Sequence, residues 1–205
     1  MASRVEGFDE KILLCAKEEF LEKGYADASL RTIAQNAGVS TSTIYTRYSD
    51  KEGLFLFLVE PAAEGLKELI RSSLTEFSSL TAQEQKEAYG EYSDQGFPGV
   101  IEYIYEYFAE FKLLITGSPG TVCQDFLESL VKLDTECMKA FLKSAGSRAW
   151  AEGRITEGFL HVVSSAFYSG IFEVVIHDMT IEDAGKYLNE LRTFYGNGWK
   201  EYLKN

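Results

Sequence analysis

Between residues 29 and 47 the sequence carries hydroxyl, phenol and cationic side chains that suit hydrogen bonding to a polyanion. Short hydroxyl side chains can approach base edges and phosphates closely, and a phenol can reach a backbone phosphate. An arginine offers a planar fork that matches a guanine edge or a phosphate. The candidate contact residues are Ser29, Thr32, Thr41, Ser42, Thr43, Tyr45 and Arg47. This chemistry is typical of nucleic-acid binding.

Structural roles stay open for some of these residues. Tyr45 can instead belong partly to a core, as aromatic side chains often do. Residues 41–43 can simply begin a helix, although a structural cap needs only Ser40. Tyr48 is interpreted as a core residue rather than a contact.

The distribution of charge permits one small footprint on DNA. The chain has a formal net charge of −12, and the segment 51–205 carries fourteen Lys/Arg against twenty-four Asp/Glu. Within 29–51 the charged residues are Arg31, Arg47 and Lys51 against Asp50 alone. A protein that coats nucleic acid without specificity would be basic throughout. The sequence therefore predicts a local contact with DNA from an otherwise acidic protein.

Enzymatic and metal chemistry find no support in the remaining reactive residues. His161 and His177 are the two histidines, and their separation along one predicted helix is roughly 24 Å at 1.5 Å per residue. Cys123 and Cys137 are about 21 Å apart by the same rise. The sequence contains no glycine-rich phosphate loop and no nucleophile elbow. We therefore expect no enzyme activity, no metal and no cofactor.

Composition predicts a cytoplasmic protein. The first residues lack the apolar segment of a secretion signal, and no apolar run approaches the roughly 20 residues that span a bilayer. The three cysteines are odd in number and scattered, which argues against a disulfide framework.

The elements that must position the polar cluster are short helices. A helix is predicted over 9–23 with Asp9 as its cap, followed by 30–37 capped by Ser29 and 41–48 capped by Ser40. Gly38 ends the middle helix. Two short helices joined by a tight turn with glycine form a helix-turn-helix pattern. Residues 49–52 are interpreted as a capping box that begins a fourth helix, in which Pro61 predicts a kink near Glu60 or a break.

Over residues 12–59 the sequence closely resembles the TetR/AcrR family of transcription regulators. The resemblance lies in Ala16, Phe20, Gly24-Tyr25, Ser29-Leu30-Arg31-Thr32-Ile33-Ala34, Ala37-Gly38-Val39-Ser40, Thr43-Ile44-Tyr45 and Tyr48-Ser49-Asp50-Lys51-Glu52-Gly53-Leu54. The sequence departs from the family at Tyr48, where phenylalanine is usual, at Asp50 beside Lys51, and in an N-terminal arm whose one cation is Arg4.

The resemblance implies an all-α fold of about nine helices in two domains. A three-helix helix-turn-helix domain that binds DNA would occupy residues 1–51, and an effector-binding and dimerisation domain would occupy 52–205. Lys51 resembles the family's phosphate-binding lysine, at a helix N-terminus that favours anions. The implied function is that of a repressor that binds a palindromic operator as a homodimer and is released by a small apolar or aromatic effector.

The predicted C-terminal domain is dense in aromatic residues, most of which must form its core. Polar residues that could orient an effector there are Tyr103, Tyr107, His161 and Tyr168, although for any one of them a structural role is favoured because ligand pockets hold few polar groups.

The last two predicted helices, 156–177 and 180–204, carry more apolar residues than one face needs. Such a pair suggests a four-helix dimer interface, with Phe167, Gly170, Leu191, Tyr195 and Trp199 as its candidate residues. The alternative is a monomer that buries both faces internally. At the level of function, the alternative to a ligand-relieved repressor is an interaction module that keeps the fold but has lost DNA binding.

Overall fold

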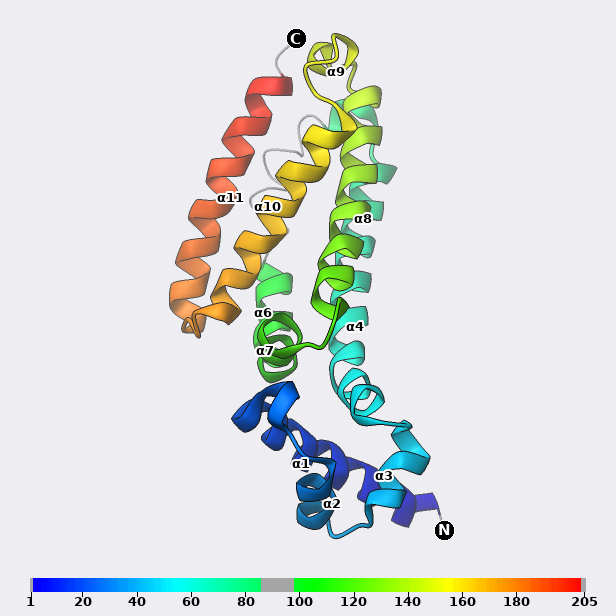
Figure 1. Ribbon diagram of the computed structural model, residues 1–205. Coiled ribbons are helices and arrows are strands. Elements are labelled where there is room, and N and C mark those ends of the chain that lie inside the picture. The colour runs from blue at the N-terminus through cyan, green and yellow to red at the C-terminus, as the bar shows by residue number, and fades with distance from the viewer. Residues whose placement is uncertain (1, 86–97, 204–205) are drawn as a thin grey trace. The chain divides into compact units, whose positions relative to one another are not determined.

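The computed structural model describes the backbone of residues 2–85 and 98–203, and in these ranges it consists of α-helices with no strand (Figure 1). The predicted all-α class is therefore confirmed for the part of the chain that is described. The helices group into two compact units. Unit 1 comprises Met1–Glu64 and Tyr107–Cys123, and unit 2 comprises Gly65–Glu106 and Gln124–Asn205.

Unit 1 begins with three helices whose ends follow from local chemistry. They are α1 (Ala2–Asp27), α2 (Leu30–Ala37) and α3 (Thr41–Tyr48). The hydroxyl of Ser29 caps α2 by accepting from the Thr32 N–H, and the hydroxyl of Ser40 caps α3 by accepting from the Thr43 N–H. Gly38 ends α2 with φ of 72°, a left-handed conformation that favours glycine. These caps and the helix-turn-helix agree with the sequence analysis.

Two predicted caps are wrong. Helix α1 begins at Ala2, so Asp9 lies inside the helix rather than at its start, and the backbone departs from helical geometry at Gly24. Ser49 does not begin α4 (Lys51–Ser79), because it ends α3 with φ of 68°. Asp50 takes the capping role, since its Oδ1 accepts from the Gly53 N–H at 2.7 Å.

The core of unit 1 is aromatic at its centre. Phe20 and Phe55 are buried, and their rings meet edge to face at 5.4 Å. Tyr25 closes the cluster by stacking on Phe20 and meeting the edge of Phe55. Helix α7 (Phe108–Gly117) adds Phe111 to the buried set of this unit. Because Phe55 belongs to α4, the compact unit around the helix-turn-helix extends beyond the domain boundary predicted at residue 51.

Helix α4 contributes residues to both units. Pro61 lies inside the helix without ending it, so the predicted break does not form. Proline has no N–H to donate, and one backbone hydrogen bond of the helix is therefore missing at this point. The boundary between the two units falls shortly after it, between Glu64 and Gly65.

Unit 2 is a helical bundle that includes the C-terminal part of α4. Its other helices are α6 (Pro98–Glu106), α8 (Val122–Ser144), α9 (Arg148–Ala151), α10 (Glu157–Ile176) and α11 (Ile181–Leu203). Helices α10 and α11 run antiparallel beside each other (Figure 1). A core cluster joins Phe77 of α4, Phe141 of α8, Leu160 of α10 and Trp199 of α11.

Helices α6 and α7 are separated at Tyr107 (φ −112°, ψ 35°). The short α9, capped by Ser147, was not predicted. The described residues contain ten helices, close to the expected number of about nine. A reciprocal capping box forms between Thr81 and Glu84, because the Thr81 N–H donates to Glu84 Oε2 at 2.8 Å and the Glu84 N–H donates to Thr81 Oγ1 at 3.3 Å.

Helix α10 is long and apolar enough to cross a membrane by length and composition alone, so the expectation that no segment reaches that length is wrong for this helix. Core helices of globular proteins pass the same test. Seven of its residues are buried within the protein, among them Leu160, Tyr168 and Phe172. We therefore interpret α10 as a core helix of unit 2.

Candidate nucleic-acid interface and ligand cavity

Helix α3 presents a polar face to the surface of unit 1. Thr41, Ser42 and Arg47 are exposed, and the Tyr45 side chain is 54% exposed. Ile44 and Tyr48, by contrast, are buried. The phenol of Tyr45 is therefore available at the surface, and the alternative that Tyr45 belongs partly to the core is not supported. The interpretation of Tyr48 as a core residue agrees with its burial.

The hydroxyl groups at the start of α3 form a local network. The Ser40 and Ser42 hydroxyls are 2.7 Å apart, and the Thr43 Oγ1 lies 2.9 Å from the Ser40 Oγ. Thr43 is half-buried, so it belongs more to the cap than to the open face. Thr46 lies on that face and was missed, although its spacing of four from Ser42 placed it there; its hydroxyl donates to the Ser42 carbonyl at 2.8 Å.

Arg47 is held by a carboxylate from another helix. Its guanidinium forms an ion pair with Asp9 Oδ1, and the Tyr48 hydroxyl donates to the same oxygen at 3.2 Å. The Arg47 side chain remains 26% exposed. Asp9 therefore orients Arg47 at one end of α3 and competes with any phosphate or base for it. Sequence reasoning missed this role because Asp9 lies far from Arg47 along the chain.

Lys51 also has partners inside unit 1. Its ammonium donates to the Ala26 carbonyl at 2.9 Å and to the Ala28 carbonyl at 3.2 Å, and it lies 4.7 Å from the centre of the Tyr25 ring. An ammonium has three N–H donors, so two of them are engaged. Lys51 thus fastens the start of α4 to the turn between α1 and α2.

The α2 candidates occupy the start of their helix. The Ser29 N–H donates to Glu19 Oε1 at 3.0 Å, and the Ser29 hydroxyl accepts from the Thr32 N–H at 3.4 Å. Both residues are half-buried. The side chain of Arg4 lies outside the residues whose side chains are described.

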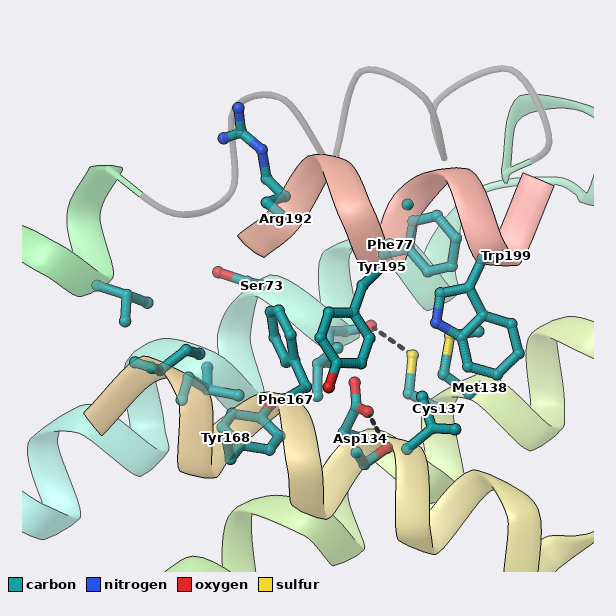
Figure 2. Close-up of a pocket in the computed structure, with 17 residues that line it drawn as sticks. Ser73, Phe77, Asp134, Cys137, Met138, Phe167, Tyr168, Arg192, Tyr195 and Trp199 are labelled. Carbon is teal, nitrogen blue, oxygen red and sulfur yellow. Dashed lines mark hydrogen bonds between the residues drawn. The ribbon is translucent and has the colours of Figure 1, made fainter. Parts of the chain in front are cut away.

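Unit 2 contains a cavity of about 180 Å³ among α4, α6, α8, α10 and α11 (Figure 2). Aromatic rings form much of its wall, and these are Phe77, Phe167, Tyr168, Tyr195 and Trp199. Its polar lining comes from Ser73, Asp134, Cys137, Ser164 and Arg192. A cavity of about 150 Å³ with apolar walls accommodates a benzene molecule, so this cavity suits a compact ring or a short branched molecule.

Asp134 is the carboxylate of this cavity. One of its oxygens accepts a hydrogen bond from the Ser164 hydroxyl. Burial raises the pKa of Asp134 above its ordinary value, and the Ser164 hydrogen bond opposes that shift only in part. Burial likewise raises the pKa of Tyr168 well above 10, with a further contribution from Asp134. Asp134 is therefore the one carboxylate in a lining that is mostly apolar and aromatic.

Residues 12–58 match the family of bacterial regulatory proteins of the tetR type. This is the segment that contains the end of α1, both helices of the helix-turn-helix and the first part of α4. A putative TetR-family regulator from Syntrophomonas wolfei has the same fold, with a TM-score of 0.65 and 18% identity over 93% of this chain and 95% of that one. The helix-turn-helix region of the chain belongs to the TetR family.

Two further relatives of this TetR-family protein carry names that describe regulation. The HTH-type transcriptional activator FasR of Mycolicibacterium smegmatis is 27% identical over 61% of this chain and 59% of its own length. The HTH-type transcriptional repressor AcnR of Corynebacterium diphtheriae is 36% identical over 30% of this chain and 32% of its own length. In both comparisons the chain spans less than two thirds of the relative.

Of the four residues predicted to orient an effector, Tyr168 lines the cavity of this TetR-family protein. The Tyr103 hydroxyl packs instead against the backbone of Gly65, where an added Cβ would collide with it. Tyr107 lies at the junction of α6 and α7, in unit 1. His161 is exposed, with its Nδ1 3.8 Å from Glu128. The structure therefore does not bring the four together.

Asp134 was missed, although the sequence carried a signal for it. Along α8 the buried residues Leu130, Met138 and Phe141 recur at helical spacing, and Asp134 falls on the same stripe. A carboxylate on an apolar stripe is uncommon because burying an unpaired charge is costly. Such a position marks a candidate site.

The residues predicted to form the dimer interface lie in the packing between α10 and α11 of one chain. The Phe167 and Tyr195 rings meet at 5.1 Å and line the cavity with the buried Trp199. Gly170 packs against Leu191, where an added Cβ would lie 3.1 Å from a methyl carbon. The exposed apolar side chains of these helices are different ones, above all Val162 at 64% and Phe194 at 75%.

Proposed function

We propose that this TetR-family protein is a ligand-responsive transcription regulator, most simply a repressor, that binds duplex DNA through α3 as a homodimer in the cytoplasm. The exposed polar face of α3 is the observation that carries the proposal. Short hydroxyl side chains, a phenol that is 54% exposed and one guanidinium share that face, and these groups suit the major groove. In this proposal the protein is a binding protein and not an enzyme.

Each group on α3 has a distinct role in the proposal. Thr41 and Ser42 allow close approach of the helix, and the Tyr45 phenol donates to a backbone phosphate. Arg47 reads a guanine edge or clamps a phosphate after it leaves Asp9. Lys51 acts mainly by fixing the turn between α1 and α2, which supports the proposed phosphate contacts of Ser29 and Thr32.

A dimer would present two α3 helices to successive turns of DNA. The exposed Val162 and Phe194 support an interface on α10 and α11, because large apolar side chains at such exposure favour burial against a partner. Two-fold symmetry of the protein predicts a palindromic operator with half-sites about 34–36 Å apart. The predicted interface residues Gly170, Leu191 and Trp199 would then support this surface from within.

An effector would act from the cavity in unit 2. Helix α4 supplies Phe77 to the cavity wall and Phe55 to the core of unit 1, so a molecule that displaces α4 acts on an element shared with the DNA-binding unit. Release of DNA requires the effector to prefer the released state, and linkage requires DNA to weaken effector binding by the same factor. A 100-fold effect corresponds to about 2.7 kcal/mol.

A second function has a specific observation in its favour. Both cations near α3, Arg47 and Lys51, already have partners within unit 1, as they would in an interaction module that has lost DNA binding. Asp9→Asn separates the two hypotheses, because it frees Arg47 without removing it. A DNA-binding protein should bind duplex DNA at least as tightly after this change, whereas an interaction module should bind no duplex in either form.

The proposed function is tested by selecting sites from a random duplex library with the full chain. The expected result is a two-fold symmetric site whose half-sites are one helical turn apart, recovered at a salt concentration that suppresses non-specific binding. A library that yields no enriched sequence over several rounds would contradict DNA binding as the function.

A further inference from the structure

The geometry of unit 2 assigns the effector of this protein to a chemical class: a compact aromatic or apolar cation whose positive group lies against the carboxylate of Asp134. This inference rests on the proposed function for its regulatory meaning, but the binding event can be measured without DNA. It is carried by the position of Asp134 in the cavity, by the aromatic walls and by the arrangement of the nearby charges.

Asp134 lines the cavity and is half-buried. Figure 2 shows its carboxylate directed toward the hydroxyl of Tyr195, with the Ser164 hydrogen bond on the other oxygen. None of the ion pairs found among the described side chains involves Asp134. A buried carboxylate without a cation is costly, and a positively charged ligand removes that cost by pairing with it.

Arg192, the cation in the cavity lining, forms no ion pair with Asp134. The Arg192 side chain points away from the ring cluster in Figure 2, and its Nη2 donates to Asn189 Oδ1 at 2.6 Å. The interior around the carboxylate is therefore acidic in character. An anionic effector would meet this carboxylate, and it would also approach a segment, 51–205, that carries ten more acidic than basic residues.

The walls suit an organic cation in particular. Phe167, Tyr195 and Trp199 line the same cavity as Asp134, and aromatic rings attract cations through their quadrupole, most strongly when water is excluded. The volume of about 180 Å³ limits the ligand to roughly a benzene ring with a small substituent. An arylammonium or a small benzylic amine satisfies both conditions, whereas a long acyl chain exceeds the volume.

Binding of such a cation must be coupled to protons. The other ionisable groups that line the cavity are Cys137 on α8, Tyr168 on α10, and Tyr195 and Arg192 on α11, while α4 and α6 supply none. Burial raises the pKa values of Cys137 and Tyr168, so both stay neutral near pH 7. Since the pKa of Asp134 is also raised in the empty cavity, a cation should displace its proton and bind more tightly as pH rises.

The test compares two probes of the same shape. Phenyltrimethylammonium carries a permanent charge and has no proton to lose, and tert-butylbenzene is its neutral isostere. Calorimetric titration of the full chain with the cation, and displacement of the cation by the isostere, should give the cation at least about tenfold higher affinity, because a buried charge pair is lost in the isostere. The affinity of the cation should rise from pH 5 toward pH 8, with release of a proton.

Two variants make the assignment specific. Asp134→Asn keeps the acceptor for Ser164 and should weaken the cation about tenfold or more while leaving the neutral isostere unchanged or tighter. Asp125→Asn removes a carboxylate from an exposed position of the same helix and is the matched control, with unchanged affinities expected. If Asp134→Asn fails to fold, as judged by its thermal transition, the pH dependence of the unmodified protein carries the test.

Several results would overturn the inference. They are equal affinities for the two probes, cation affinity that is independent of pH, no binding of either probe, or tighter binding of benzoate than of the cation. The proposed function is tested separately, by binding of the selected duplex without any probe. A chain that binds that duplex but prefers tert-butylbenzene is a regulator of another ligand class, whereas a chain that binds only the cation is not a DNA-binding regulator.

Discussion

The face of α3 and the cavity of unit 2 are specified by the sequence in different ways. The face of α3 comes from eight consecutive residues whose helix is fixed by Ser40 and by the turn at Gly38. The cavity takes its lining from five helices between Ile70 and Trp199. A site built from one short helix follows from local chemistry, whereas a site built from many helices depends on how those helices pack.

The largest effect is expected in the core that supports α3. Phe55→Ala removes a fully buried ring that contacts Phe20 and Tyr25, and should lower the free energy of unfolding by about 3–5 kcal/mol. Phe57→Ala, two residues away and 55% exposed, is the matched control and should cost within about 1 kcal/mol. Urea denaturation measures both. Equal losses would mean that the cluster around Phe55 does not hold the unit together.

Dimerisation should depend on surface residues of unit 2 rather than on its cavity wall. Val162→Glu with Phe194→Glu should raise the dissociation constant of the dimer at least tenfold, since each buried apolar side chain contributes about 1.5–3 kcal/mol. Leu21→Glu, on an exposed position of α1, should leave association unchanged. Sedimentation equilibrium of the three proteins decides the matter. A double variant that remains a dimer as tight as the unmodified protein would place the interface elsewhere.

A smaller effect, with a defined sign, is expected for Asp134 on stability. Its pKa is raised in the folded protein by burial, so the folded state keeps a proton that the unfolded chain loses near its ordinary pKa of 3.8. The contribution of Asp134 to the free energy of unfolding is therefore most favourable at acid pH. This contribution is lost as the pH rises from 3.8 through the raised pKa of the folded state. The difference in unfolding free energy between Asp134→Asn and the unmodified protein should shift in favour of the variant between pH 4 and pH 7. A difference that does not change with pH would contradict the burial of this carboxylate.

The sequence predicted the helix-turn-helix closely because its determinants are local. Ser29, Gly38 and Ser40 act within four residues of where they stand, and the family resemblance covers the same segment. The role of Asp9 was not predictable in this way, since its partner Arg47 is brought to it by the packing of α1 against the other helices. The cap of α4 is Asp50 rather than Ser49 for a local reason, since Ser49 ends α3 with φ of 68° and Asp50 Oδ1 accepts from the Gly53 N–H.

The cavity was predicted only as a general expectation for the family. Of the four effector candidates, Tyr168 lines the cavity and the other three do not. The sequence does not distinguish among them, because a helical core offers aromatic residues several burial sites of similar chemistry. The packing of α10 on α11 likewise placed Phe167, Tyr195 and Trp199 inward, which helical periodicity alone does not determine. The informative signal was a polar residue on an apolar stripe, Asp134 among Leu130 and Met138.

The most direct test of the account is a DNA titration of Arg47→Ala and Tyr45→Ala on two duplexes, the selected site and the same site with one guanine pair replaced in each half. The account predicts that Tyr45→Ala weakens binding to both duplexes equally, because a phosphate contact carries no sequence information. Arg47→Ala should weaken binding to the selected duplex by about 1–3 kcal/mol per half-site and reduce the discrimination between the duplexes. Unchanged affinity and unchanged discrimination in both variants would contradict the claim that α3 reads DNA.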